Sequence, residues 1–225
     1  MEELKPFEAE RRQMVEFQLR GRGIRDERVL AAMLHVPRHE FVPKKFMELA
    51  YQDRPLPIGK AETISQPYIV AAMTEAALVQ PGDVVLEVGT GSGYQAAVLA
   101  WLGARVYSIE RVQELAESAR ARLARLGYGA VEVVCGDGSE GYSAGAPYQA
   151  ILVTAASPQP PPALVDQLAV GGRMVIPVGG FRLQRLQLME KTVSGIAVRN
   201  LDSCQFVPLI GKYGWPQKSL GRENA

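Results

Sequence analysis

A glycine-rich segment gives the strongest chemical signal in the chain. The sequence Val84-Val-Leu-Glu-Val-Gly89-Thr-Gly91-Ser-Gly93-Tyr94 runs from an apolar stretch into a loop that opens a helix-like stretch. Glycines permit a tight turn and let a ligand approach the backbone without meeting a Cβ. A dinucleotide-binding loop has the spacing GxGxxG, whereas the spacing here is GxGxG, with Tyr94 where the rule asks for glycine. The segment therefore predicts a nucleotide-type loop that departs from the NAD pattern.

Three acidic residues lie in or just after successive apolar stretches. Glu87 lies inside the first, and a buried carboxylate there costs several kcal/mol unless it is paired or reaches a cationic ligand, such as a sulfonium or an amino group. Glu110 lies 17 residues beyond Gly93, where a carboxylate can accept hydrogen bonds from both hydroxyls of a ribose. Asp137 follows the third stretch, in a turn suited to an adenine edge. Each acid alone is more often a helix cap or a solvated turn, but the loop and both later acids in order favour a nucleoside site.

The elements that must position these residues alternate along the chain. We expect strands and helices in turn, the strands at Val84–Val88, Arg105–Ile109, Val131–Val134, Ala150–Thr154 and Arg173–Pro177, and the helices at Gln95–Leu102, Val112–Leu126 and Pro162–Leu168. This alternation predicts a parallel sheet covered on both faces, with right-handed crossovers that bring the acids to its carboxyl edge. Beyond Gly180 the β-like segments Leu183–Glu190, Gly195–Leu201 and Cys204–Leu209 predict antiparallel pairing. The fold class is α/β, doubly wound and mostly parallel.

The chain before the glycine loop reads as helical at first. Asp26 can cap a helix within the first 50 residues. Ser65 fits the N-cap of a later helix, because Pro67 tolerates only the first turn and apolar residues then recur at helical spacing. Neither His35 nor His39 is assigned a catalytic role, since the first ends a helix and the second lies in a Pro-bounded turn.

Composition bounds the function further. The 225 residues carry 25 Lys plus Arg against 24 Asp plus Glu, a net charge of +1, so we expect no nucleic-acid partner and no membrane partner. The apolar runs are far shorter than the roughly 20 residues needed to cross a bilayer. The N-terminus lacks a secretory pattern, which predicts a cytoplasmic protein. Cys135 and Cys204 have neither zinc-ligand spacing nor a disulfide framework, and we expect no metal site.

The segments EVGTGSGY, SIE and GDG resemble the class I S-adenosylmethionine-dependent methyltransferases. The resemblance implies a seven-stranded, Rossmann-like sheet with an antiparallel edge and an added N-terminal helical segment. It implies that S-adenosyl-L-methionine is the cofactor and S-adenosyl-L-homocysteine its product. The glycine loop would line the methionine portion, Glu110 would hold the ribose and Asp137 would face the adenine. The implied cofactor-binding residues are Thr63, Ile64, Glu87, Gly89, Thr90, Gly91, Ser92, Gly93, Glu110, Asp137, Gly138 and Thr154.

A second resemblance is more specific, because it spans many segments in order from about residue 10 to Trp215. The segment Leu56-Pro-Ile-Gly-Lys-Ala-Glu-Thr-Ile-Ser-Gln-Pro-Tyr-Ile69 closely resembles the protein-L-isoaspartate O-methyltransferases, as do Asp26-Glu-Arg-Val-Leu30, Val36-Pro-Arg-His39, Phe41-Val-Pro43, Ile151–Ala156, Gly171–Gly179 and Phe206-Val-Pro-Leu209. It implies methyl transfer to the free α-carboxylate of an L-isoaspartyl residue in a damaged protein or peptide. The ester then collapses to a succinimide, whose hydrolysis returns some normal aspartate, so the outcome is protein repair.

The same resemblance assigns the acceptor site. Ser65 matches the family's catalytic serine, and Ile58, Ser65, Val207 and Leu209 would contact the substrate. A carboxylate is already ionised near neutral pH and needs no strong base, so we expect Ser65 to orient the acceptor rather than to act as a nucleophile. A plain N-cap role is the alternative, and both roles can hold at once. The Val207-Pro208-Leu209 segment can be an edge strand, a peptide-docking strand or both.

Three other functions compete with protein repair. A small-molecule methyltransferase would share the glycine loop and both acids but needs a closed acceptor pocket, and a noncatalytic module would bind cofactor or altered peptide without turnover. An oxidoreductase is disfavoured by Tyr94.

We expect a monomer with a single domain over residues 1–215: a helical and acceptor-site segment at 1–80, a cofactor-binding core at 81–180, and an antiparallel edge and substrate segment at 181–215. A frayed tail is expected at 216–225.

Overall fold

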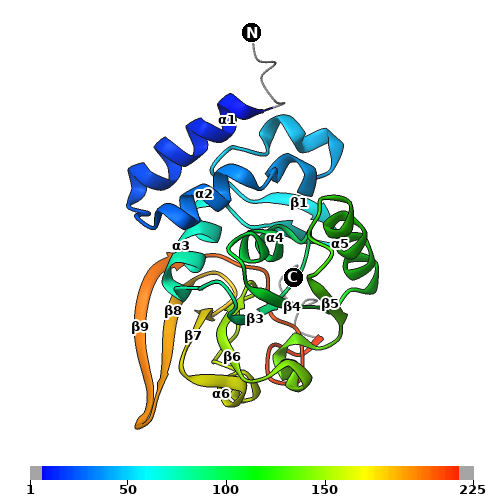
Figure 1. Ribbon diagram of the computed structural model, residues 1–225. Coiled ribbons are helices and arrows are strands. Elements are labelled where there is room, and N and C mark those ends of the chain that lie inside the picture. The colour runs from blue at the N-terminus through cyan, green and yellow to red at the C-terminus, as the bar shows by residue number, and fades with distance from the viewer. Residues whose placement is uncertain (1–6, 218–225) are drawn as a thin grey trace.

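A computed structural model describes residues 7–217, so most of the expected tail, residues 218–225, lies outside the described residues. The N-terminal layer contains α1 (Glu8–Gln13), π-helical turns over Met14–Leu19 and α2 (Glu27–His35), followed by 3₁₀ turns (Figure 1). Asp26 caps α2 as predicted, because its carboxylate accepts hydrogen bonds from the backbone amides of Arg28 and Val29. The helical character expected of the first 50 residues is confirmed for the described part, residues 7–50.

A seven-stranded sheet forms the centre of the fold, in the order β5-β4-β3-β6-β7-β8-β9. Its strands are β3 (Val84–Val88), β4 (Arg105–Glu110), β5 (Glu132–Cys135), β6 (Tyr148–Val153), β7 (Leu168–Gly179), β8 (Gln184–Thr192) and β9 (Gly195–Cys204). The first five pair in parallel, whereas β8 pairs antiparallel with β7 and β9 antiparallel with β8. The predicted fold class, a mostly parallel doubly wound sheet with an antiparallel edge, is confirmed.

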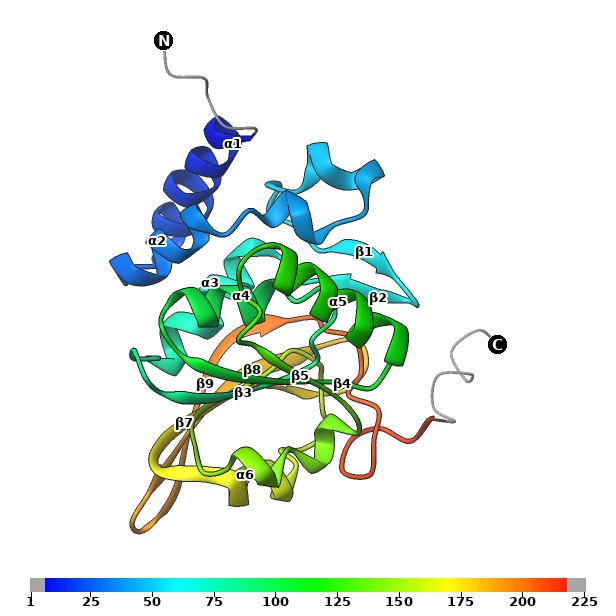
Figure 2. The same ribbon diagram turned by 45° about the vertical axis from the view of Figure 1, so that its right-hand side comes forward.

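Helices cover both faces of this sheet. On one face lie α3 (Pro67–Ala77), α4 (Tyr94–Trp101) and α5 (Gln113–Arg125), with the N-terminal layer beyond them, and on the other lies α6 (Pro162–Gln167) (Figures 1 and 2). Alternation along β3 divides its side chains between two cores: Val85 packs on the α4 side, while Leu86 and Val88 pack on the α6 side. Glu87 therefore shares the face of Val85, toward α4.

The segment around Ser65 corrects one prediction. The residue at the N-cap of α3 is Gln66, and neither it nor Ser65 caps the helix with its side chain. Gln66 is held extended because it precedes Pro67, so the helix starts too late for Ser65 to reach its first amides. Instead, the Tyr68 amide donates a hydrogen bond of 3.4 Å to Asp53 Oδ1, from 15 residues earlier in the chain. The Ser65 hydroxyl is thus left available.

Two further elements differ from the predictions. A hairpin of β1 (Leu56–Gly59) and β2 (Glu62–Ile64) carries the acceptor-site segment, for which no strand pairing was predicted. The expected strand Cys204–Leu209 is wrong, since β9 already ends at Cys204. The chain then crosses to the loop after β6, where the Ala156 amide donates to Val207 O and the Leu209 amide to Ala156 O. Val207-Pro208-Leu209 is therefore not an edge strand of the main sheet.

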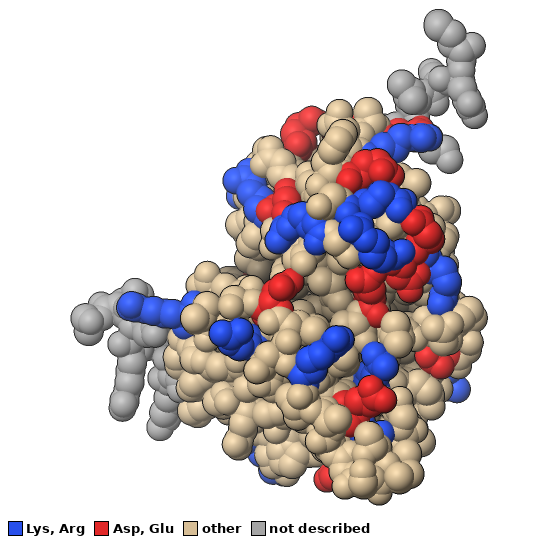
Figure 3. All heavy atoms as spheres, turned by 90° about the vertical axis from the view of Figure 1, so that its left-hand side faces the viewer, with Lys and Arg blue, Asp and Glu red and all other residues tan. Residues whose placement is uncertain are grey.

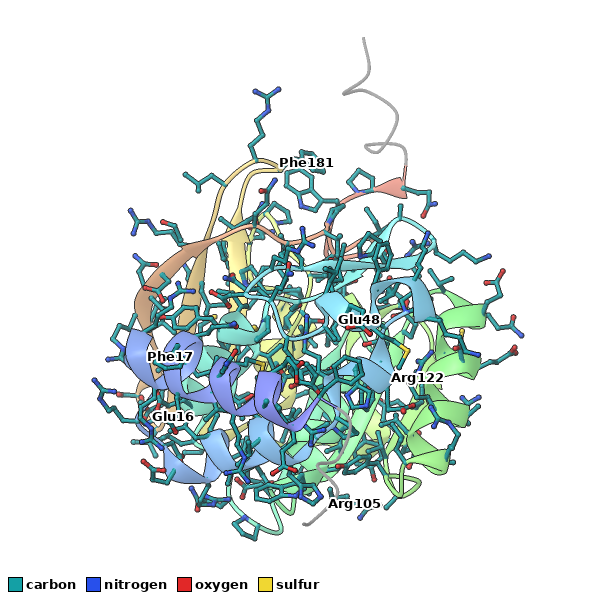
Figure 4. The ribbon with its side chains drawn as sticks, turned by 90° about the horizontal axis from the view of Figure 1, so that it is seen from above. Glu16, Phe17, Glu48, Arg105, Arg122 and Phe181 are labelled. Atoms are coloured by element: carbon teal, nitrogen blue, oxygen red, sulfur yellow. The ribbon has the colours of Figure 1, made fainter. Side chains whose placement is uncertain are left out.

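The surface of the N-terminal layer carries mixed charge. Figure 3 shows basic and acidic atoms interspersed over it, and Arg20 forms ion pairs with Glu16 and Glu27. In the view from above, Phe17 lies at the outer side of this layer and Phe181 at the tip of the β7–β8 loop, where its ring centroid is 4.0 Å from that of Trp215 (Figure 4). None of the helices in the described part of the chain has the length and apolar character needed to span a bilayer.

Candidate active site

A cleft opens at the carboxyl ends of β3, β4 and β6. The chain proceeds from β3 to β4 in one direction, and β6 pairs with the opposite side of β3, so the loops after these strands separate. This is the topological switch point, where open α/β sheets bind ligands. The hairpin strand β2 and the segment after β9 complete the walls, which are formed by Glu62–Ser65, Val70, Glu87–Ser92, Tyr94, Gln95, Ile109–Arg111, Gly138, Thr154, Ala155 and Val207–Ile210.

The glycine loop is held from two sides. Gly89 adopts φ +99°, and a Cβ on it would collide with the Thr154 hydroxyl, whose single hydrogen is shared between Val88 O at 3.0 Å and Gly89 O at 2.7 Å. Only glycine fits this position without strain. From α5, the guanidinium of Arg122 donates to Ser92 O at 2.8 Å, and burial lowers its pKa. Arg122 is labelled in Figure 4. The loop is therefore fixed before any ligand enters.

Glu110 ends β4 with both carboxylate oxygens accepting backbone hydrogen bonds. The Gly91 amide donates to Oε2 and the Val112 amide to Oε1, each at 2.9 Å. The side chain is 7% exposed and lines the cleft. A carboxylate oxygen has two lone pairs, so each oxygen can still accept one more hydrogen bond. The position and remaining capacity of this carboxylate suit a pair of ligand hydroxyls.

Glu87 is fully buried at the inner wall of the cleft. The parallel register pairs Glu87 with Ser108, and the Ser108 hydroxyl donates a hydrogen bond to Glu87 Oε2. The Thr90 hydroxyl lies 2.6 Å from Ser108 Oγ and extends this series of hydrogen bonds into the glycine loop. Oε1 has no hydrogen-bond partner among the described residues. Burial raises the pKa of Glu87 to about 8; the Ser108 hydrogen bond and the backbone amide of Ala96 oppose this, and the Glu110 charge adds to it.

The cleft has an excess of carboxyl groups. Its charged lining residues are Glu62, Glu87, Glu110 and Arg111. The pKa of Glu62 is raised by burial and by the charge of Glu110, while Arg111 opposes the shift. A cationic ligand would relieve this repulsion, whereas an anionic pyrophosphate would add to it. The charge therefore favours a sulfonium or ammonium ligand.

Asp137 does not line the cleft, unlike its neighbour Gly138. Its Oδ1 accepts hydrogen bonds from the amide and hydroxyl of Ser139 at 2.9 and 2.7 Å, and its Oδ2 accepts from the Lys212 amide at 2.7 Å. The Tyr213 amide adds a bond of 3.0 Å to Ser139 Oγ. Asp137 thus anchors the segment that follows Leu209 and Ile210. An adenine contact for this residue stays a prediction.

A second cavity adjoins the cleft and shares four of its residues, Thr63, Ser65, Thr154 and Val207. One wall is built by Arg22, whose guanidinium lies 3.6 Å from the ring centroid of Tyr68, and by the Tyr68 hydroxyl, which donates to Asp202 Oδ2 at 2.8 Å. The rim is formed by exposed residues, namely Arg182, Leu183, Asp202, Ser203 and Gln205. This cavity is an open groove. Ser65 lies where the groove and the cleft meet, and its hydroxyl forms no hydrogen bond within residues 7–217.

The structure brings together thirteen of the sixteen predicted site residues in the cleft: Thr63, Ile64, Ser65, Glu87, Gly89, Thr90, Gly91, Ser92, Glu110, Gly138, Thr154, Val207 and Leu209. Three lie outside it. Gly93 packs against Leu123 of α5. Ile58 lies beside Gly91, because a Cβ built on Gly91 would come within 3.3 Å of Ile58 Cδ1. Asp137 is the third. The roles of all sixteen remain predictions.

Sequence reasoning missed several residues of the site. Arg111 directly follows Glu110, and Glu62 precedes Thr63, so both could have been found from their neighbours. Gln95 lies two residues beyond Gly93 on the first turn of α4 and is 6% exposed. A polar residue at the start of an otherwise apolar helix was the available signal. Three other titratable side chains lie outside the cleft. His39 is buried with Nδ1 2.7 Å from the Tyr51 hydroxyl, and Cys135 and Cys204 are free thiols.

The parallel sheet with its antiparallel edge, the GxGxG loop after β3 and the carboxylate at the end of β4 define a class I methyltransferase fold with a nucleoside cleft. The protein-L-isoaspartate(D-aspartate) O-methyltransferase (PCMT) family matches residues 9–214. The chain is 56% identical over 213 residues to a protein-L-isoaspartate O-methyltransferase of Methanoculleus marisnigri, covering 95% of this chain and 97% of the relative. A Koribacter versatilis relative of the same name is 55% identical, covering 95% and 96%. The chain therefore belongs to this family.

Solved structures agree with this placement. A protein-L-isoaspartate O-methyltransferase structure superposes with a TM-score of 0.82 at 30% identity, covering 91% of this chain and 67% of that one. A Plasmodium falciparum structure described as a member of the same family, in complex with S-adenosyl-L-homocysteine, gives a TM-score of 0.77 at 27% identity, covering 89% and 98%.

Proposed function

We propose that this protein is a repair methyltransferase that moves a methyl group from S-adenosyl-L-methionine to the free α-carboxylate of L-isoaspartyl residues in damaged proteins and peptides. One observation carries the proposal beyond family membership. Ser65, Thr63 and Val207 line both the nucleoside cleft and the open groove, so a donor in the cleft and a peptide in the groove would meet at these residues.

The residues of the cleft fit the methyl donor. The unpartnered Oε1 of buried Glu87 and the excess of carboxyl groups suit a ligand with two cationic groups. Glu110 suits the ribose hydroxyls, because each of its oxygens keeps a lone pair. When bound, S-adenosyl-L-methionine supplies an electrophilic methyl group on a sulfonium, and loss of that methyl group leaves the neutral thioether S-adenosyl-L-homocysteine. The walls from β2 and the Val207–Ile210 segment flank that end of the cleft, where they can shield a bound donor from water.

The chain's own task is to place the acceptor. A carboxylate oxygen is already deprotonated near neutral pH, so it needs no base and attacks the methyl carbon directly. The free Ser65 hydroxyl can donate one hydrogen bond to the second carboxylate oxygen and so fix its orientation. Alignment of this kind contributes up to roughly 7–11 kcal/mol in oriented reactions. Within residues 7–217 the Ser65 hydroxyl forms no hydrogen bond to a histidine, which supports orientation over nucleophilic catalysis.

The open groove favours this acceptor over a small metabolite. A metabolite methyltransferase needs a pocket that encloses its acceptor, whereas the rim of the groove here is exposed on both the Arg182 and the Gln205 side. A peptide of varied sequence can lie across such a rim with one residue inserted. The isoaspartyl residue would be that inserted residue.

A paired-peptide assay tests the proposal. Labelled S-adenosyl-L-methionine is incubated with an isoaspartyl peptide, with its aspartyl twin and with a panel of small carboxylic acids. We expect base-labile label on the isoaspartyl peptide alone. Equal labelling of the two peptides would refute isoaspartyl repair, and label on small acids only would favour the metabolite enzyme. Stoichiometric binding of cofactor with no ester formed would identify a noncatalytic module.

Three properties complete the proposal. The protein acts as a single domain over residues 1–215, supported by the core on the α4 side of the sheet, which joins Met14 of the N-terminal layer to Cys204 at the end of β9. It acts as a monomer, supported by large exposed apolar side chains that lie on separate elements, such as Phe17 and Val193. Its compartment is the reducing cytoplasm, supported by two free thiols.

A further inference from the structure

Gln95 carries a polar group that the fold leaves unsatisfied. Its side chain is 6% exposed, lies on the first turn of α4 and lines the cleft. The amide nitrogen Nε2 donates a hydrogen bond of 2.9 Å to Thr74 Oγ1, but the amide oxygen Oε1 has no partner among the described residues. A buried acceptor without a partner is costly, so its missing partner calls for an explanation, such as a bound ligand or a water molecule.

The orientation of this amide is fixed by α3. The Thr74 hydroxyl donates its single hydrogen to Val70 O at 2.7 Å. It can therefore only accept from Gln95, which obliges the glutamine to present its NH₂ group to Thr74 and its oxygen to the other side. The relay from Val70 through Thr74 thus determines that an acceptor, and not a donor, faces the cleft.

A second unpartnered acceptor belongs to the same cleft. Glu87 points to the α4 side of the sheet, is completely buried, and its Oε1 also lacks a partner. When Glu87 is ionised, both oxygens are acceptors, and one donor with at least two N–H or O–H groups can satisfy both. Burial raises the pKa of Glu87 to about 8, and a cationic donor would oppose this shift by stabilising the ionised carboxylate.

We propose that Gln95 Oε1 and Glu87 Oε1 together bind the α-ammonium group of the methyl donor, with Thr74 as the positioning residue that orients the Gln95 amide. The inference rests on the proposed function, because it needs S-adenosyl-L-methionine or its product as ligand. It adds a neutral acceptor and its supporting hydroxyl to the residues that bind the cofactor. A water molecule is the competing donor for the same two oxygens.

Calorimetric binding of three ligands separates these alternatives. The ligands are S-adenosyl-L-homocysteine, its analogue with hydrogen in place of the α-amino group, and 5′-methylthioadenosine, which lacks the amino-acid portion. We expect Gln95→Met to weaken S-adenosyl-L-homocysteine roughly 10- to 100-fold, the range for a hydrogen bond to a charged group. Binding of the other two ligands should change less than threefold. Equal weakening of all three would show that the amide is only structural and overturn the proposal.

Thr74 supplies a second, independent pair of variants. Thr74→Val keeps the shape but lets the amide rotate, and we expect a loss confined to S-adenosyl-L-homocysteine, restored by Thr74→Ser. Gln149→Met is the matched control, because the Gln149 amide oxygen accepts from the Val84 amide at the opposite end of β3. It should alter melting temperature without changing the ratio of the three affinities.

The unaltered protein gives the last comparison, which needs no variant to fold. It should bind S-adenosyl-L-homocysteine at least tenfold more tightly than the deaminated analogue. Equal affinity for the two would mean that water, not ammonium, satisfies the oxygens, and would overturn the inference while leaving the proposed function intact. Failure to bind any of the three ligands would instead contradict the proposed function.

Discussion

The amide of Gly91 and the carboxylate of Glu110 are joined by a hydrogen bond of 2.9 Å, which ties the glycine loop after β3 directly to the end of β4. One acid therefore shapes the loop and faces the nucleoside cleft at the same time. Because its other oxygen holds the Val112 amide at the start of α5, loss of this carboxylate would disturb three elements together.

Removal of the Glu110 carboxylate should affect both stability and binding. Glu110→Ala leaves two amides without an acceptor, and we predict a loss of about 1–3 kcal/mol in the free energy of unfolding. Affinity for adenosine should fall at least tenfold. Glu110→Gln retains one acceptor oxygen and should lose less of both. Urea unfolding and calorimetry with adenosine measure the two effects, and unchanged adenosine affinity in Glu110→Ala would argue against ribose binding.

The raised pKa of Glu87 predicts a pH-dependent stability. Its folded value of about 8 lies above the ordinary 4.5, so between these values the folded protein binds more protons than the unfolded chain. The stabilising contribution is complete below about pH 4.5 and is lost as pH rises toward 8, with a slope of at most about 1.4 kcal/mol per pH unit. Urea unfolding of the ligand-free protein at several pH values measures this slope.

Glu87→Gln is the reference for that experiment, because it cannot ionise. Relative to it, the unaltered protein should become progressively less stable from pH 5.5 to 8. Ser108→Ala removes the hydrogen bond that lowers the Glu87 pKa, so the loss should extend to higher pH. Parallel stability curves for the unaltered protein and Glu87→Gln would show that the carboxyl titrates normally.

Ser65→Ala should separate chemistry from stability. The Ser65 side chain does not cap α3, so we predict a melting temperature within about one degree of the parent and unchanged affinity for S-adenosyl-L-homocysteine. The value of kcat/KM for an isoaspartyl peptide should fall at least tenfold, as expected for the loss of a charge-assisted hydrogen bond. Ser203→Ala, which alters a serine of the groove alone, is the control. Normal turnover with Ser65→Ala would remove Ser65 from the catalytic account.

Asp137→Ala should release the segment after Ile210. We predict faster hydrogen exchange at the Lys212 and Tyr213 amides and a loss of about 1–3 kcal/mol in stability, since the carboxylate accepts from Lys212 and orients Ser139. Adenosine affinity should change less than threefold. A large loss of adenosine affinity would instead support the adenine contact that the family resemblance implies.

Much of the fold was predictable because local pattern and burial agree in it. Val85, Leu86 and Val88 are buried in the parallel pairing of β3 with β4, and Glu110 is buried at the end of β4, as the spacing of these residues implies. The positions of strands β3 to β7 follow from such runs, although β7 begins at Leu168, five residues before the predicted start, because its glycine pair imitates a turn. These predictions depend on neighbours in sequence.

What could not be predicted depends on contacts that are distant in sequence. Asp53 supplies the hydrogen bond to the first turn of α3 that Ser65 was expected to make. The path of Val207–Leu209 is set by pairing with Ala156, about fifty positions away, and Asp137 is held by Lys212. The polar character of Gln95 at the start of an apolar helix is visible in the sequence, but its unpartnered oxygen beside the cleft is not. In each case the chemistry is decided by a partner that no local pattern identifies.

A crystal structure of the protein with both S-adenosyl-L-homocysteine and an isoaspartyl peptide tests the central claim most directly. The account predicts the thioether sulfur in the cleft beside the glycine loop, the peptide along the groove, and one oxygen of the isoaspartyl α-carboxylate aimed at the position of the transferred methyl group, with the Ser65 hydroxyl on the other oxygen. A sulfur bound away from the cleft, or a carboxylate that points away from it, would contradict the account.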